Sequence, residues 1–166
     1  MNIDYTLLIL VAWLFFVFQN RNDQKYRRNV SIFLCLAFIA EAGLRDYQHM
    51  MNDTFNYENW FESLKSERLG DIISSFSLSY KNYEDRDPGF TIFTKLFQLT
   101  GGDFRMFLIF IASIISIPLC RLLYKYVPTV NGLFMSAMIY QALFAGFFNT
   151  GMRQTIGILF VVVDIL

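Results

Sequence analysis

The chain has 166 residues, of which 55% are hydrophobic and only 17% are charged, and its mean hydropathy is +0.38. A soluble domain of this length could not cover so much apolar surface, so the composition excludes an ordinary soluble protein and indicates an all-α membrane protein. The formal net charge is zero, which argues against a nucleic-acid partner. Cys35 and Cys120 both lie in apolar runs, where small packing residues are expected rather than a disulfide.

Apolar runs along the chain predict about four to five membrane-spanning helices, because a helix needs about 20 apolar residues to cross the hydrocarbon core. The expected spans, within a single membrane domain, are residues 5–20, 29–44, 104–120, 130–148 and 153–166. The last run reaches the end of the sequence just after Asp164, so we expect the N-terminal part of a longer multi-span protein. A short protein with an incomplete last span is the alternative.

Basic residues predict the orientation of these spans. The segments Arg21–Arg28 and Arg121–Lys125 are both rich in arginine and lysine, and two spans separate them. They are therefore expected on the same side of the membrane, and the positive-inside rule makes that side the cytoplasm. The N-terminus and the polar segment 45–103 are then expected on the outer side.

The segment 45–103 is the long polar stretch of the chain, and it is expected to carry amphipathic helices. Four of its apolar residues recur at the spacing of one helix face. They are Tyr57, Trp60, Phe61 and Leu64. This pattern predicts a helix that lies on the outer membrane surface with Trp60 at headgroup level. A side-chain oxygen of Asp53 or Thr54 is suited to cap its first turn.

Two further elements are expected in the same segment. Around Ile72 and Ile73 the pattern is weak and fits either a helix or a strand, and both remain open. A clearer helix starts at Pro88, with Asp87 as its cap, and ends before Gly101. This helix is too short to cross the bilayer, so we expect it to be re-entrant or wedged between spans.

Ionisable groups at membrane depth are costly, which makes them candidates for function. Arg45 and Arg153 are expected on the same side, where two guanidinium groups suit a pyrophosphate. The alternative is that each side chain snorkels to the interface. Asp53 and Asp87 are candidate general bases, with helix capping as the alternative role. Glu41 is expected to pair with Arg45, one helical turn later.

A metal site or a bound cofactor is not expected. His49 is the single histidine, and the acidic residues around it do not follow a metal-ligand spacing. The sequence also contains no glycine-rich phosphate loop, no nucleophile elbow and no dinucleotide fingerprint.

Four short motifs follow one another along the chain. They are Gly43-Leu44-Arg45, Asp53-Thr54-x-x-Tyr57, an acid followed by Pro88-Gly89-Phe90, and Met152-Arg153-Gln154. In this order and membrane context they resemble the EpsG-like family. That family comprises bacterial membrane proteins of the Wzy type, which polymerise exopolysaccharide or capsule repeat units. The resemblance extends from the second expected span onward, and family members are much longer than this chain.

The resemblance implies glycosyl transfer at the outer face of the bacterial cytoplasmic membrane. The donor would be a glycan on a polyprenyl diphosphate, and the acceptor a lipid-linked repeat unit. By this resemblance Arg45 and Arg153 would hold the diphosphate, and Asp53, or alternatively Asp87, would act on the acceptor hydroxyl. The other residues of the implied substrate-binding set are Thr54, Tyr57 and Gln154. The implied partners are the lipid bilayer and other polysaccharide assembly proteins.

Two other classes of function stay open. A transporter or flippase of lipid-linked sugars would also carry charges in the membrane. It predicts charged or broken helices near the bilayer midplane, whereas the charges here gather at the outer boundary. The other class is a truncated, non-catalytic membrane scaffold that pairs with a polymerase.

Overall fold

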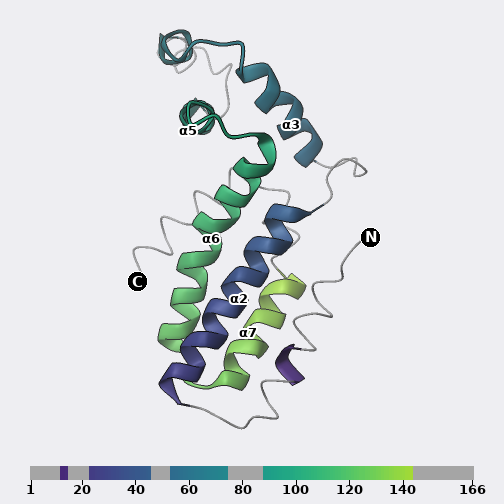
Figure 1. The fold of residues 1–166 in the computed structure, drawn as a ribbon, viewed down its shortest axis with the longest axis vertical. Helices are drawn as coiled ribbons and strands as arrows, with labels where there is room; N and C mark the ends of the chain where they lie inside the picture. The colour runs from purple at the N-terminus through teal and green to yellow at the C-terminus, as the bar shows by residue number, and fades with distance from the viewer. Residues whose placement is uncertain (1–11, 15–22, 46–52, 75–87, 144–166) are drawn as a thin grey trace. The chain divides into compact units, whose positions relative to one another are not determined.

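The computed structural model describes residues 12–14, 23–45, 53–74 and 88–143 (Figure 1). Almost all of these residues are helical, and none of the residues described lies in a strand. The named helices are α2 (Gln24–Leu44), α3 (Asp53–Leu64), α5 (Pro88–Gln98), α6 (Phe104–Tyr126) and α7 (Val130–Leu143). The predicted all-α fold is therefore confirmed.

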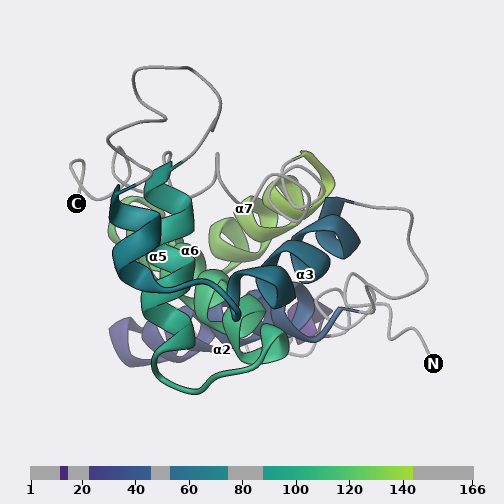
Figure 2. The same ribbon diagram turned by 90° about the horizontal axis from the view of Figure 1, so that it is seen from above.

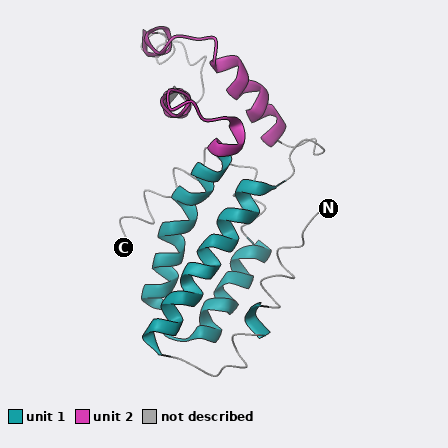
Figure 3. Cartoon of the chain, in the orientation of Figure 1, with its two compact units in different colours: residues 1–46, 108–166 teal, residues 47–107 magenta. Residues whose placement is uncertain are grey.

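The chain divides into two compact units, which are coloured separately in Figure 3. Unit 1 comprises residues 1–46 and 108–166, and unit 2 comprises residues 47–107. Helix α6 begins in unit 2 and continues into unit 1. Each unit has its own packing, and the two are described in turn.

In unit 1, α2 packs against both α6 and α7 (Figure 1, Figure 2). The buried residues that form its core are Val30, Leu34, Ala37 and Phe38 of α2, Cys120 of α6, and Val130, Leu133, Phe134 and Ala137 of α7. Polar groups join the helices as well as apolar ones. The hydroxyl of Ser31 donates a hydrogen bond of 3.1 Å to the backbone carbonyl of Cys120, which ties α2 to α6.

Helix α2 begins at Gln24, five residues before the expected start of this span. The cause is Asp23, whose carboxylate accepts a 2.7 Å hydrogen bond from the Tyr26 amide and so caps the first turn. The basic residues that follow therefore lie in the helix rather than in a loop. Arg27 donates hydrogen bonds to the carbonyls of Tyr124 (2.9 Å) and Val127 (2.8 Å). It thereby satisfies carbonyl groups at the C-terminal end of α6.

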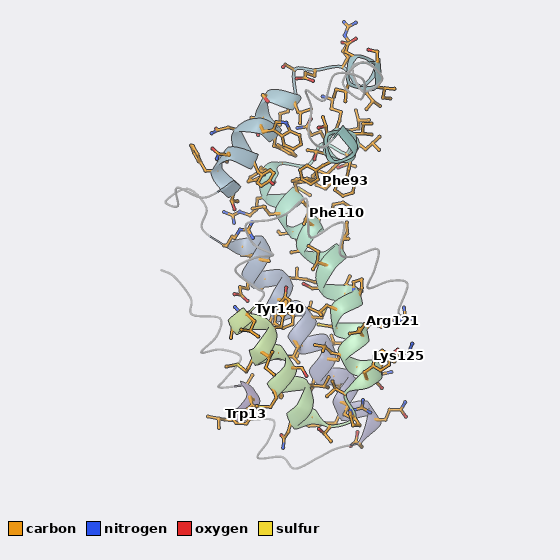
Figure 4. All side chains as sticks on the ribbon, turned by 180° about the vertical axis from the view of Figure 1, so that it is seen from behind. Trp13, Phe93, Phe110, Arg121, Lys125 and Tyr140 are labelled. Atoms are coloured by element: carbon orange, nitrogen blue, oxygen red, sulfur yellow. The ribbon has the colours of Figure 1, made fainter. Side chains whose placement is uncertain are left out.

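Helix α6 is the one helix, within the described ranges, that is long and apolar enough to cross a membrane. Its 23 residues give a length of about 34 Å, which matches a hydrocarbon core of about 30 Å. It continues past the expected end at residue 120, so Arg121 and Lys125 lie in its last two turns rather than in a loop. Both side chains are exposed at the surface of α6 (Figure 4). Helix α7 is also apolar but is shorter over its described residues.

Unit 2 is held together by aromatic rings from α3, α5 and the first turn of α6. Phe107 is 1% exposed and lies at the centre of this cluster. Its ring contacts those of Phe61, Phe90, Phe93, Phe97 and Phe104, with centroid distances between 5.2 and 6.4 Å. Such rings bury large apolar areas and prefer the tilted arrangements that are observed here.

The helix bounds in unit 2 test several expectations. Helix α3 starts at Asp53, so Thr54 lies inside the first turn and does not precede it. A short helix covers residues 69–74, which decides in favour of a helix around Ile72. Helix α5 starts at Pro88, as predicted. Gly101 follows its end with a φ of 79°, a conformation that glycine adopts without strain.

The expected four to five spans and the outer segment 45–103 remain predictions, since helix bounds alone do not place a membrane. Several of the segments concerned lie outside the described residues. They are 1–11, 15–22, 46–52, 75–87 and 144–166.

Candidate functional site

The structure describes part of the expected site. Arg45, Thr54 and Tyr57 are described with their side chains. Asp53 is the first residue of α3, but its side chain is not described, and Asp87 lies outside the described residues. Arg153 and Gln154 also lie outside the described residues. The expected pairing of two arginines on one diphosphate therefore stays a prediction.

Arg45 directly follows the last turn of α2, with extended backbone angles (φ −55°, ψ 146°), and its side chain is partly buried. Gly43 fixes where that turn lies. A Cβ atom at Gly43 would come within 2.7 Å of the Ile109 side chain and 3.0 Å of the Ile109 Cα. Such distances are too short for any side chain, so glycine is required for this close approach of α2 to α6.

A polar contact holds the same end of α2 to α7. The side-chain amide of Gln141 donates a hydrogen bond to the carboxylate of Glu41, one helical turn before Arg45. Next to it, the rings of Phe38 and Tyr140 pack with centroids 4.8 Å apart. Arg45 therefore follows a helix end that is in contact with both α6 and α7. The expected pair of Glu41 and Arg45 stays a prediction.

In unit 2 the structure brings two of the sequence motifs together. The ring of Tyr57 meets the edge of Phe90, with centroids 6.0 Å apart and an interplanar angle of 70°. Trp60 stacks on the same ring at 5.4 Å and 13°. Thr54 is 2% exposed at the start of α3. The Asp-Thr-x-x-Tyr motif and the Pro-Gly-Phe motif are therefore in contact, through the rings of Tyr57 and Phe90.

Two residues outside the expected site also shape unit 2. Lys95 is only 6% exposed, and its ammonium group donates hydrogen bonds to the carbonyls of Leu64 (2.7 Å) and Lys65 (3.3 Å). Gln98 donates a hydrogen bond of 2.5 Å to the carbonyl of Phe61. Both side chains therefore bind the C-terminal end of α3, where free carbonyls and the helix dipole favour a cation. Their spacing of three residues places both side chains on one face of α5.

Within the described ranges, no three histidine, cysteine or acidic side chains lie close enough together to hold a metal ion. His49, the only histidine, is outside these ranges. The expectation of no metal and no cofactor is thus not tested.

The helical fold, the membrane-length helix α6 and the apolar helix α7 define an all-α membrane protein. Within that class, the chain belongs to the EpsG family, whose sequence model matches residues 29–164. This match confirms the resemblance that the four motifs indicated. Comparison with curated proteins and with solved structures gave no match. The EpsG family is associated with polysaccharide polymerisation, so the chain is assigned to polysaccharide biosynthesis at a membrane.

Proposed function

We propose that the protein joins lipid-linked oligosaccharide repeat units into exopolysaccharide or capsule at the outer face of the bacterial cytoplasmic membrane. The observation that carries this proposal is the family match over residues 29–164, which includes every expected site residue. In the reaction, the acceptor hydroxyl oxygen bonds to the anomeric carbon of the donor glycan. The bond from that carbon to the polyprenyl diphosphate breaks, the diphosphate leaves with the electron pair, and the hydroxyl proton passes to a carboxylate.

The contacts of Arg27 support the proposed orientation. Its hydrogen bonds to Tyr124 and Val127 bring the start of α2 and the end of α6 together. The basic residues of both helices therefore gather at one end of unit 1, as the positive-inside rule requires for a cytoplasmic end. The segment 45–103 follows the opposite end of α2, and we place it outside on this ground.

Arg45 and Arg153 are assigned to the diphosphate. Guanidinium groups keep their charge at any physiological pH and bind phosphate oxygens with two parallel hydrogen bonds. They would stabilise the negative charge that develops on the leaving diphosphate. For Arg45 this role needs a fixed position, and the contacts of Gly43 and Glu41 provide one.

Asp53 is assigned as the base that accepts the proton of the acceptor hydroxyl, with Asp87 as the alternative. Thr54 and Tyr57 follow Asp53 on the first turns of α3, and their packing holds this part of the helix in place. Gln154 is assigned to substrate binding beside its neighbour at position 153.

The test is a strain that lacks this gene and carries either the wild type or a variant on a plasmid. Arg45→Ala should reduce polymer yield by a factor of at least about 100, because each buried charge-assisted contact to a transition state contributes about 3–4 kcal/mol. Arg121→Ala is the matched control, since it removes an exposed arginine at the end of α6. Normal polymer from Arg45→Ala, with the protein present in the membrane, would remove the diphosphate assignment.

A further inference from the structure

Helix α5 exposes a surface without charge. Lys95 is its one charged residue, and the hydrogen bonds to the carbonyls of α3 keep its ammonium group inside unit 2. On the outside, Leu96 is 51% exposed, and Leu99, just after the helix, is 65% exposed. Exposed leucines on a helix that carries no exposed charge suit contact with a partner or with lipid.

Helix α3 has the opposite character. Four apolar residues of α3 were expected to face the membrane. Phe61 and Leu64 are 0% and 2% exposed, and Tyr57 and Trp60 are half-buried. The rings of Tyr57, Trp60 and Phe61 contact the aromatic core of unit 2. Apart from Phe55, which is 44% exposed, the exposed side chains of α3 are polar. They are Asn56, Asn59, Glu62 and Ser63. This surface suits water rather than lipid.

The chain connects α5 directly to the membrane-length helix. The link from α5 to α6 is short and ordered, with hydrogen bonds from the amides of Thr100 and Gly101 to the last turn of α5. Asp103 then caps α6 through a 2.8 Å hydrogen bond from the Met106 amide. Since a residue spans at most about 3.5 Å, Leu99 lies within about 18 Å of the start of α6.

The length of α6 bears on where its first turn would lie in a bilayer. For a helix that crosses the bilayer, a length of about 34 Å only just exceeds the hydrocarbon thickness, so its first turn lies close to the headgroups. Met106, in that first turn, is 57% exposed. The exposed leucines of α5 are therefore followed, a few residues later, by another exposed apolar residue at the start of α6.

We propose that α5 is an interfacial helix, whose uncharged surface at Leu96 and Leu99 contacts the lipid of the bilayer while α3 faces water. The burial of Lys95 makes this contact possible. Because its ammonium group binds the carbonyls of α3, its charge is kept away from the exposed surface of α5, where lipid would exclude it. The proposal concerns the surface of unit 2 and does not depend on the reaction assigned above. It reverses the expectation that α3 is the helix on the membrane surface.

The test uses the full-length protein in lipid nanodiscs, with both native cysteines replaced by alanine. Single cysteines at Leu99→Cys and Asn59→Cys are labelled with an environment-sensitive fluorophore, and nitroxide-labelled lipid is added to the discs. At Leu99→Cys we expect blue-shifted emission that the nitroxide lipid quenches several-fold more strongly than at Asn59→Cys. Leu96→Cys is a second site with the same expected result, should Leu99→Cys fail to fold.

Two results would overturn the proposal. Equal quenching at positions 99 and 59, or stronger quenching at 59, would mean that α5 is not the lipid-facing helix. Blue-shifted emission at position 99 without quenching by the nitroxide lipid would mean that protein, a second copy or another part of the assembly, covers this surface.

Discussion

The two units differ in how their helices pack. Both units have hydrogen bonds between helices and a hydrophobic core, but the cores differ. The core of unit 1 is mostly aliphatic, and Gly43 lets α2 approach Ile109 closely. The core of unit 2 is a cluster of aromatic rings around Phe107. In lipid the hydrophobic effect does not drive helices together, so small residues and hydrogen bonds do so. In water the burial of rings is strongly favourable. The close helix contact of unit 1 is therefore of a kind that also works in lipid, whereas the ring cluster of unit 2 is of a kind that is favoured in water.

The largest expected effect is in the aromatic core. Phe107→Ala should destabilise unit 2 by about 3–5 kcal/mol, because it removes a fully buried ring and leaves a cavity. Limited proteolysis of the purified protein should then cut within residues 47–107 much faster than in the wild type. Phe110→Ala is the control, since this neighbouring ring on α6 is 39% exposed. Equal proteolysis of the two variants would contradict the central role of Phe107.

In unit 1 the corresponding change is Gly43→Ala. The added methyl group would lie 2.7 Å from the Ile109 side chain, and such overpacking costs about 1–3 kcal/mol. We expect a lower unfolding temperature and less polymer, because the helix end that precedes Arg45 must move. Gly70→Ala is the control, since nothing lies within 4 Å of a Cβ atom there. If Gly43→Ala behaves like Gly70→Ala in both measurements, the close approach of α2 and α6 is not required.

A smaller effect is expected at the link between α5 and α3. Lys95→Met keeps the aliphatic stem but leaves the carbonyls of Leu64 and Lys65 without their donor, at a cost of about 1–3 kcal/mol. Hydrogen exchange of the amides in α3 should become faster, while exchange in α7 should not change. Lys65→Met removes an exposed ion pair with Glu62, which contributes about 0–1 kcal/mol, and the contact of the ammonium group with the Phe61 ring, 5.6 Å from its centroid. A larger effect from Lys65→Met than from Lys95→Met would contradict this description.

The smallest effect is expected for the hydrogen bond between Gln141 and Glu41. Bonds of this kind between membrane helices contribute about 0.6 kcal/mol on average. A double-mutant cycle with Gln141→Leu and Glu41→Gln in nanodiscs should give a coupling energy of about this size. A coupling energy near zero would show that the two side chains do not support each other.

Some features of the fold could be predicted from local sequence patterns, and others could not. The start of α5 followed from Pro88, and the all-α fold followed from the apolar runs. The start of α2 was missed by five residues, because hydrophobicity alone did not reveal the cap at Asp23. The packing partners of α3 could not be predicted, since periodicity identifies an apolar face but not what covers it. The rings of α5 and α6 cover the apolar face of α3.

The candidate site was predictable only through its motifs. The packing of Tyr57 and Trp60 on Phe90 joins two motifs that are more than thirty residues apart, which spacing alone could not show. Lys95 and Gln98 were missed because a lysine on an apolar helix reads as a surface charge. Its burial depends on carbonyl groups of another helix, and no local pattern encodes them.

The central claim is that this protein polymerises lipid-linked repeat units on the outer side of the membrane. The most direct measurement compares a strain deleted for the gene with its parent, by the length of the surface polysaccharide and by the leaflet in which lipid-linked units accumulate. We expect polymer to be lost and single repeat units to collect in the outer leaflet. Units trapped in the inner leaflet would indicate a transporter, and unchanged polymer would contradict a role in polymerisation altogether.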